Sequence, residues 1–330
     1  MKVIIPLAGK GTRLRPHTHL TPKPLMQVAG QPVINYILDQ LTQFDVEEII
    51  FITGHLREQI ESYIKTHYPN FKSRFIEQED QNGTAGAVGL AELYVESDVL
   101  IIFVDTLFEA DLSSVKSLSP GTSGLIWVKE VEEYEHFGVV VTDNDGMMNR
   151  IVEKPKEAIS RLANIGLYYI RDSKLLFDGI RHVLKQNPGP RGEYFLTDAL
   201  QYMVDKGAKI KVEEVSAWYD CGQMQTLIDT NRYLLNSGRA RTPKLREGVI
   251  INEPVYVAED VELSEVELGP NVTIASGCVI QKSKIRDSII GERTTVEAAE
   301  LHSSLIGNDV VIKGIQGSLS VTDHSEIVGA

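Results

Sequence analysis

The segment PLAGKGTRLRPHTHLTPKPL, residues 6–25, combines glycines and cations in a spacing that can hold phosphate groups. Gly9 and Gly11 allow a sharp turn in which backbone N–H groups face a bound anion. Arg13 offers a planar pair of donors to phosphate oxygens, and Lys23, between two prolines, offers a point charge. The order of residues fits neither the dinucleotide pattern GxGxxG nor a Walker A loop. These residues favour a triphosphate clamp, with a solvated basic loop as the alternative.

Two aspartates follow strand-like segments and have the chemistry of ligands for a hard cation. Asp105 ends the apolar run VLIIFVD, where a buried carboxylate needs a partner. Asp220 lies in WYDCG, and a helix N-cap is the alternative role for it. Mg²⁺ commonly takes one or two carboxylates together with substrate phosphates and water, so Asp105, at the end of a strand, is a plausible magnesium ligand.

The motif GxGTRLxP, followed by PKPL, resembles the signature of the sugar-1-phosphate nucleotidyltransferases, and later blocks match in order over nearly the whole chain. The resemblance implies transfer of a nucleotidyl group from a nucleoside triphosphate to a sugar 1-phosphate, with release of pyrophosphate. It implies that Mg²⁺ is the cofactor, with Asp105 and Asp220 as its ligands. The catalytic residues that it implies are Arg13, Lys23, Asp105 and Asp220. The nucleotide-binding residues that it implies are Leu7, Ala8, Gly9, Gly11, Thr12, Arg13, Gln78, Gly83 and Thr84.

The stretch QEDQNGTAG, residues 78–86, resembles the base-recognition segment of this family. The amide of Gln78 has both a donor and an acceptor, which suits the imide edge of uracil or thymine. Gly83 leaves room for the base, and Thr84 is expected to cap the next helix. A plain helix-entry turn is the alternative for this stretch taken alone.

Four further blocks resemble the sugar-binding face of the family: FGVVV (137–141), VEKPK (152–156), NIGLYYI (164–170) and RGEYFLTDAL (191–200). The residues implied to bind the sugar phosphate are Gly138, Glu153, Lys154, Asn164 and Glu193. Taken alone, an exposed Glu-Lys pair is ordinary solvated charge. Val104 stands where the family usually has a glycine before the metal aspartate, which leaves the sugar preference open.

The elements that must position these residues alternate in type along residues 1–242. Short apolar runs predict strands at 2–7, 48–53, 99–104 and 124–129. Apolar residues at helical spacing predict helices at 32–44, 56–68, 85–94, 173–185, 194–205 and 224–235. Such alternation is typical of a doubly wound, Rossmann-like α/β domain with a mostly parallel sheet, whose ligands bind beyond the carboxyl ends of the strands.

The sequence changes character near residue 243, so we expect a second domain over residues 243–330. Aliphatic residues recur there every six positions, as in Ile251, Val257 and Leu263. Units such as LGPNVT and IGNDVV resemble the hexapeptide repeats of a short left-handed β-helix. The breaks in phase at 263–268, 280–290 and 296–306 are expected to be bulges or loops.

Composition limits the classes of partner. With 42% hydrophobic and 24% charged residues the chain is globular, and its net charge of −13 disfavours nucleic acids and anionic membranes. Cys221 and Cys278 form no metal or disulfide pattern. The N-terminus lacks an export signal, which favours the cytoplasm.

We therefore expect a nucleotidyltransferase that uses dTTP or UTP and glucose 1-phosphate, and that forms a homo-oligomer through its repeat domain. The alternative substrates are GTP and mannose 1-phosphate. A second class is a non-catalytic sensor or scaffold that keeps the fold. An added acyltransferase activity would need a reactive histidine such as His302 or His324.

Overall fold

A computed structural model describes residues 1–189, 192–244 and 247–329 of the chain. They form two compact units, each described by itself. The first combines Met1–Lys10 with Leu38–Trp218. The second combines Gly11–Ile37 with the chain from Tyr219 onward, so it holds both an N-terminal segment and the repeats.

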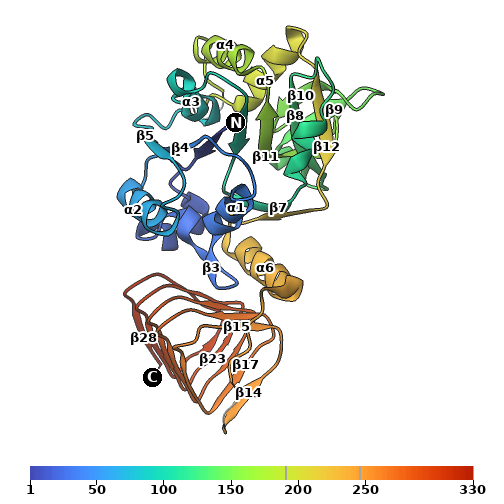
Figure 1. The fold of residues 1–330 in the computed structure, drawn as a ribbon. Coiled ribbons are helices and arrows are strands. Elements are labelled where there is room, and N and C mark those ends of the chain that lie inside the picture. Colours follow the sequence, from blue (N-terminus) through green and yellow to red (C-terminus); the bar gives the residue numbers. More distant parts are fainter. Residues whose placement is uncertain (190–191, 245–246, 330) are drawn as a thin grey trace. The chain divides into compact units, whose positions relative to one another are not determined.

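The first unit is built on a sheet that is parallel on one side and antiparallel on the other (Figure 1). Its central strands are apolar because both sheet faces are covered, and Ile4, Ile50 and Ile101 have no exposed surface. The parallel strands, in spatial order, are β6 (Val99–Ile102), β1 (Lys2–Pro6), β4 (Glu48–Thr53) and β5 (Ser73–Glu77). Beyond β6, β11 (Leu162–Ile170) runs antiparallel and pairs with β8 (Gly124–Glu130) and β9 (Gly138–Thr142). The remaining strands of this sheet are β10 (Met148–Glu153) and β12 (Ile210–Glu214).

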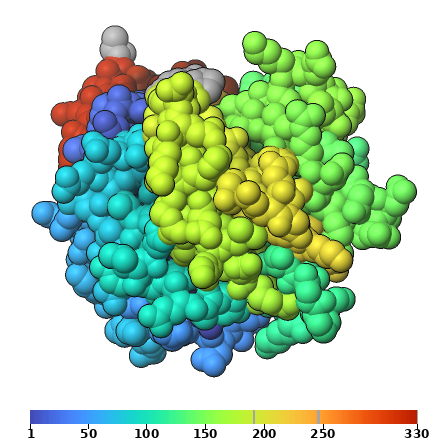
Figure 2. Space-filling view, turned by 90° about the horizontal axis from the view of Figure 1, so that it is seen from above, coloured from blue at the N-terminus to red at the C-terminus, as the bar shows by residue number. Residues whose placement is uncertain are grey.

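The helices of this unit lie at the expected places, which confirms the α/β class. They are α2 (Arg57–His67), α3 (Thr84–Gly89), α4 (Ser173–Leu184) and α5 (Leu196–Asp205). Figure 2 shows one face of the unit, on which the chain around α4 (yellow-green) lies beside the chain around α3 (blue-green). The helix expected over 85–94 is shorter, because α3 ends at Gly89, a weak helix former, and a separate 3₁₀ turn covers Glu92–Tyr94. The α1 helix (Val33–Leu41) contains the division between the units. A separate two-stranded sheet pairs β7 (Thr106–Glu109) with β13 (Ala217–Asp220).

In the second unit, three parallel sheets of five short strands form five stacked coils (Figure 1), consistent with a left-handed β-helix. The first sheet contains β14 (Val249–Ile251), β17 (Val266–Leu268), β20 (Lys284–Arg286), β23 (Glu300–His302) and β26 (Gln316–Gly317). The second contains β15 (Val255–Val257), β18 (Val272–Ile274), β21 (Ile289–Ile290), β24 (Leu305–Ile306) and β27 (Ser320–Val321). The third contains β16 (Glu262–Ser264), β19 (Val279–Gln281), β22 (Thr295–Glu297), β25 (Val311–Lys313) and β28 (Glu326–Val328).

The expectation of bulges or loops at the breaks in hexad phase was wrong. Ile285 and Leu301 lie in these breaks, are 1% exposed, and stack in register on Leu268 in the first sheet. The phase breaks because some sides of the coil contain five residues instead of six. The corners between sides use residues with positive φ, including Asp287 at 45° and Arg293 at 54°.

Buried hydroxyl groups join successive coils. Ser288 is fully buried, donates to the carbonyl of Arg286, and accepts from the N–H of Ser304 one coil later at 3.0 Å. Ser304 repeats the pattern with the N–H of Leu319 at 3.0 Å. These two hydroxyls therefore satisfy backbone groups at the turns that precede β21 and β24.

Preceding the coils, the second unit contains the hairpin β2 (Gln27–Val28) and β3 (Gln31–Pro32), together with α6 (Met224–Leu234). Both cysteines are free and buried, and burial raises the pKa of the Cys278 thiol to about 11. In the part of the chain that the structure describes, no helix is long and apolar enough to cross a membrane.

Candidate functional site

The glycine-rich loop begins at the carboxyl end of β1, in the first unit. The N–H of Leu7 continues the parallel pairing by donating to Ile52 at 2.7 Å. The carbonyl of Ala8 accepts from the side chain of Gln81 at 2.9 Å. At Gly9, no atom of the described chain lies within 4 Å of where a Cβ would be, so the backbone is open to a ligand on that side.

The rest of the loop belongs to the second unit and is made of short 3₁₀ turns. Gly11 has a φ of 59° and precedes the turn Thr12–Leu14, from which Arg13 extends into solvent. The hydroxyl of Thr18 donates to the carbonyl of Gly11 at 2.9 Å. Lys23 begins the turn Lys23–Leu25, with Pro22 before it and Pro24 after it, which limits its backbone freedom.

Asp220 and Arg13 approach the same glycine within the second unit. The Oδ1 atom of Asp220 accepts from the N–H of Gly222 at 2.9 Å, and its Oδ2 accepts from the hydroxyl of Thr226 at 3.1 Å. A Cβ at Gly222 would lie 2.7 Å from Asp220 Oδ1 and 2.8 Å from Arg13 Nη2. Asp220 is not the N-cap of α6, since Gln223 holds that position. Glycine at 222 is thus required for a carboxylate and a guanidinium to stand this close.

Asp105 lies in the turn between β6 and β7 of the first unit and is half-buried. Burial raises the pKa of Tyr168, and the negative charges of Glu153 and Asp105 raise it further. Both carboxylates therefore lie close enough to the Tyr168 hydroxyl to disfavour a third negative charge. Among the described residues, no group of three or more His, Cys, Asp and Glu side chains can hold a metal ion.

The segment expected to recognise the base is folded on itself. Gln78 is 7% exposed, and its Nε2 donates to the carbonyl of Gly83 and to Asn82 Oδ1, both at 3.2 Å. Thr84 does not cap α3, because Gly83 is the N-cap residue and the Thr84 hydroxyl instead accepts from the N–H of Leu196 at 2.9 Å. A planar amide that turns its nitrogen toward the loop presents its oxygen on the opposite side.

The residues expected to bind the sugar are brought together by β9, β10, β11 and α5. A Cβ at Gly138 would collide with Asn164 Nδ2 and would lie 2.9 Å from Glu153 Oε2. Glu153 accepts from the Thr197 hydroxyl at 3.2 Å, and its other oxygen lies 3.5 Å from the amine of Lys154. Burial raises the pKa of Glu153 above its usual 4.5, and the charge of Lys154 opposes that rise. The cluster has room because residue 138 has no side chain.

Glu193 stands apart from the contacts of this cluster. It is half-buried, and its carbonyl accepts from the N–H of Gly189 at 2.8 Å. Arg191, in the same block, lies outside the described residues.

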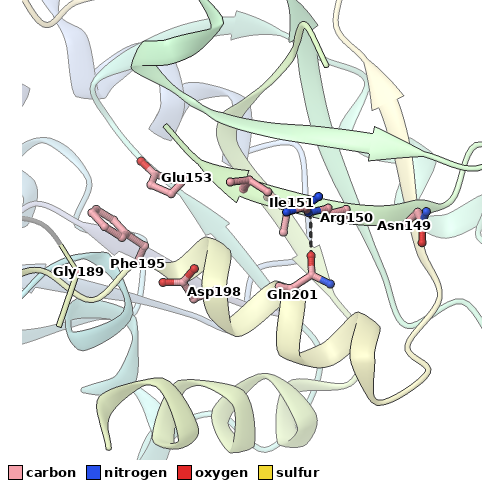
Figure 3. A pocket seen from close by; sticks show the side chains of 9 residues that line it. Asn149, Arg150, Ile151, Glu153, Gly189, Phe195, Asp198 and Gln201 are labelled. Carbon is pink, nitrogen blue, oxygen red and sulfur yellow. Dashed lines mark hydrogen bonds between the residues drawn. The ribbon is translucent and has the colours of Figure 1, made fainter. Parts of the chain in front are cut away.

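A pocket of about 580 Å³ opens beside the cluster, between β10 and the start of α5 (Figure 3). Glu153 and Phe195 lie at one end, and Gln201 lies near the other, where its Oε1 accepts from the N–H of Ile151 at 2.9 Å. The Lys154 amine lies 5.4 Å from the centre of the Phe195 ring. Polar side chains of the pocket, such as Asp198 and Gln201, therefore adjoin the cluster that contains Glu153.

Three polar residues of the site were not expected from the sequence: Tyr168, Thr197 and Thr226. The Tyr168 hydroxyl donates to Asn164 Oδ1 and orients its amide. Tyr168 and Thr197 lie inside blocks that resemble the family, and Thr226 lies three residues into α6. The sequence signal that could have indicated these three residues is a hydroxyl side chain close in the chain to a polar residue already expected in the site.

Comparison with known proteins agrees with this fold and these motifs. The family model described as nucleotidyl transferase matches residues 2–237, and the chain belongs to this family. It is an enzyme of the sugar-1-phosphate nucleotidyltransferase class, with a C-terminal region of hexapeptide repeats.

Its relatives include archaeal proteins. The Bifunctional protein GlmU of Methanocaldococcus jannaschii is 35% identical over 78% of this chain, and the match spans 60% of that protein. The Bifunctional protein GlmU of Methanococcus aeolicus is 31% identical over 94% of this chain and 77% of its own length. The low-salt glycan biosynthesis nucleotidyltransferase Agl11 of Haloferax volcanii is 29% identical over 93% of this chain and 92% of its own length.

Two solved structures share the fold. One is a UDP-glucose pyrophosphorylase complexed with UDP-glucose, with a TM-score of 0.63 and 24% identity over 72% of this chain and 98% of that one. The other is a Bacillus anthracis protein assigned as a glucose-1-phosphate thymidylyltransferase, in complex with a sucrose, with a TM-score of 0.61 and 28% identity over 71% of this chain and 94% of that one.

Proposed function

We propose that this enzyme transfers the nucleotidyl group of UTP or dTTP to glucose 1-phosphate. A phosphate oxygen of the sugar attacks the α-phosphorus, the bond from that phosphorus to the bridging oxygen breaks, and pyrophosphate leaves with the electron pair. Both reactants are anions, so alignment and neutralisation of charge are the main catalytic tasks. The sugar phosphate is already ionised near pH 7 and needs no general base.

Our proposal for the base rests on the orientation of the Gln78 side-chain amide. Its Nε2 is engaged by Gly83 and Asn82, so Oε1 is the atom left to meet a nucleotide. An acceptor at that place pairs with the imide N–H of uracil or thymine, whereas N3 of cytosine is itself an acceptor. Guanine has two adjacent donors, which suit a carboxylate better than one amide oxygen. UTP and dTTP are therefore the favoured donors, and GTP with mannose 1-phosphate is the less favoured alternative.

The hexose 1-phosphate is proposed to bind at the cluster around Gly138. Glu153 and Asn164 offer an acceptor and an amide to sugar hydroxyls, while Lys154 offers a charge to the phosphate. The two related structures concern glucosyl substrates by name, which supports glucose 1-phosphate. The match to the bifunctional relatives does not extend over their full length, and no second activity is carried over from them.

Magnesium is proposed as the cofactor, with Asp105 and Asp220 among its ligands. The ion would neutralise phosphate charge and polarise the phosphorus that is attacked. Carboxylate oxygens suit Mg²⁺, which commonly takes one or two of them together with nucleotide phosphates and water. Asp220 is already oriented for such a role by Gly222 and Thr226.

Pyrophosphate release with four nucleoside triphosphates tests the base. With glucose 1-phosphate and Mg²⁺, we expect UTP and dTTP to be used, with kcat/KM at least about 10²-fold above that for CTP or GTP, because the wrong base leaves a buried polar group unpaired. The methyl group of thymine changes the preference by about tenfold to 10²-fold at most. Preference for GTP with mannose 1-phosphate would contradict this assignment.

Gln78→Glu tests the role of that amide directly. A carboxylate would face the carbonyl of Gly83 and Asn82 Oδ1 without a proton to donate, so we expect the preference for UTP to fall. The control is Gln43→Glu, at an exposed position after α1. Equal preference in Gln78→Glu and wild type would show that the base is read elsewhere.

Assembly of a homo-oligomer through the coils stays a prediction. It is tested by light scattering on the full chain, for which a mass of 36.7 kDa would indicate a monomer and contradict it.

A further inference from the structure

The N-terminal segment that carries the nucleotide-binding signature is bonded to the last coil of the repeat region. The Nε2 atom of His17 lies 3.0 Å from the hydroxyl of Ser320. The hydroxyl of Thr21 donates to Asp323 Oδ2 at 2.8 Å. The hydroxyl of Thr322 donates to the carbonyl of Pro16 at 3.4 Å. Residues more than 300 positions apart thus form one hydrogen-bonded contact within the second unit.

The other end of the same segment is anchored to earlier parts of that unit. The N–H of Ala29 donates to Asn231 Oδ1 at 2.8 Å, and Asn231 is fully buried. The Thr273 hydroxyl donates to the same Oδ1 at 2.7 Å. The ring of Tyr256 lies where a side chain at Gly30 would be. The segment is therefore held at both ends, with Lys23 between them.

If the contact of His17 and Thr21 with the last coil were lost, the residues proposed to bind phosphate would be displaced as well. Thr18 adjoins His17, donates to the carbonyl of Gly11, and lies 3.0 Å from where a Cβ of Gly11 would be. Lys23 Cβ lies 3.2 Å from the same point. A loop of short 3₁₀ turns has few backbone bonds of its own, so its shape depends on such outside contacts.

His17 makes this anchor sensitive to the loss of one partner. Its side chain is 2% exposed, and its Nδ1 has no hydrogen-bond partner among the described residues. Burial lowers the pKa of His17, and the charge of Asp323 partly opposes that change. Removing the Ser320 hydroxyl would leave both ring nitrogens of a buried imidazole unpaired, which is costly.

We propose that the last coil holds the nucleotide-binding loop in its working conformation, with Ser320 and Asp323 as positioning residues. The proposal rests on the proposed function of the loop, which is to bind the nucleoside triphosphate. The repeat region then has a part in catalysis within one chain. An isolated 1–242 segment, which the sequence suggests as a self-sufficient catalytic domain, would lack both partners.

The experiment compares hydroxyl deletions in the full-length chain. Ser320→Ala combined with Thr21→Val removes both bonds with little change of volume. The matched control is Ser318→Ala in the same coil, because the Ser318 hydroxyl donates within the repeats, to the carbonyl of Ser303 at 2.8 Å. A second control, Thr21→Ser, keeps the hydroxyl that donates a hydrogen bond to Asp323. Melting temperatures establish that all variants are folded.

We expect kcat/KM for UTP to fall about tenfold in the double variant, as expected for the loss of one or two hydrogen bonds, with KM for glucose 1-phosphate within twofold of wild type. Ser318→Ala and Thr21→Ser should keep wild-type values. Equal kcat/KM for UTP in the double variant and wild type would overturn the inference, as would an equal loss in Ser318→Ala.

Calorimetric titration with UTP and Mg²⁺ separates this inference from the proposed function. Weaker binding in the double variant supports the inference even if the wild type turns over no glucose 1-phosphate, an outcome that would contradict the proposed function alone. Equal dissociation constants together with equal kcat/KM would contradict the inference alone. No binding of UTP, dTTP, CTP or GTP to the wild type would contradict both.

Discussion

The proposed function has two halves, sugar binding and nucleotide binding, and the regions proposed to carry them are built in different ways. The sugar-side cluster, defined by Gly138, Glu153, Asn164 and Thr197, stands on adjacent strands and one helix of the first unit. The loop proposed to bind the nucleotide consists of 3₁₀ turns and is hydrogen-bonded to the repeats of the second unit. Strand pairing fixes side chains by many bonds, whereas the loop relies on a few distant ones. The comparison teaches that the sugar-side cluster is stabilised locally, whereas the loop is stabilised from elsewhere in the chain.

Substitution of the two aspartates proposed as magnesium ligands tests whether both units are needed for the chemistry. Asp105→Asn in the first unit and Asp220→Asn in the second should each lower kcat by about 10³-fold or more, because each removes charge next to Mg²⁺. Pyrophosphate release at saturating Mg²⁺ measures the loss. Asp145→Asn, in the exposed turn between β9 and β10, is the control with unchanged kcat. A near-normal rate in either variant would show that the replaced aspartate is not a ligand of the catalytic metal.

Arg13→Lys tests the loop half alone. Lysine keeps the charge but loses the planar pair of donors, so we expect kcat to fall about 10²-fold, comparable to the loss of one oriented donor in the transition state. Steady-state kinetics with UTP measures the loss. Arg161→Lys, at an exposed ion pair with Glu132, should behave as wild type. An unchanged kcat in Arg13→Lys would mean that Arg13 is a solvated side chain.

A matched pair of alanine substitutions separates the two halves. Gly222→Ala would press on Asp220 and Arg13, whereas Gly138→Ala would press on Asn164 and Glu153. The crowded atoms are side-chain ends, so the fold should survive. We expect Gly222→Ala to raise KM for UTP about tenfold and Gly138→Ala to raise KM for glucose 1-phosphate about tenfold, each corresponding to about 1.4 kcal/mol. The same KM shifts in both variants would show that the halves are not separable.

The smallest expected effect concerns the stability of the sheet-built half. Because burial raises the pKa of Glu153, its ionised form is disfavoured in the folded state. The stability it contributes is complete below the unfolded value of 4.5 and is lost as pH rises through the folded pKa. Glu153→Gln should therefore raise the melting temperature at pH 7 by about 1–2 °C and leave it unchanged below pH 4.5. A lower melting temperature at pH 7 would mean that Lys154 and Thr197 outweigh burial.

The α/β elements and the repeats could be predicted because each leaves a period in the sequence. Strands such as β1 and β4 are continuous apolar runs, and the coils show aliphatic residues at fixed spacing. Ile285 and Leu301 escaped detection because the five-residue sides shift the phase of the repeat. A search for aliphatic residues at every sixth position misses those that follow a side of the coil with only five residues.

The supports of the site could not be predicted in the same way. Ser320 and His17, like Asn231 and Ala29, are joined by single hydrogen bonds between distant residues, and no local pattern announces them. The orientation of the Gln78 amide likewise depends on Gly83 and Asn82, whose placement needs the folded loop. Motifs indicate which residues do chemistry. The residues that fix the positions of those side chains are found only in the three-dimensional structure.

The spacing of the coils has a consequence for how this chain can vary in length. The N-terminal segment is tied to Tyr256 in the first coil, to Glu292 in the third and to Ser320 in the fifth. Neighbouring coils are separated by about 4.8 Å, the distance between paired strands. One extra coil inserted before Ser320 would carry its hydroxyl about that far from His17 and break the attachment. We therefore expect an extra coil between Tyr256 and Ser320 to break one of these attachments, whereas an extra coil after Ser320 would leave all three in place.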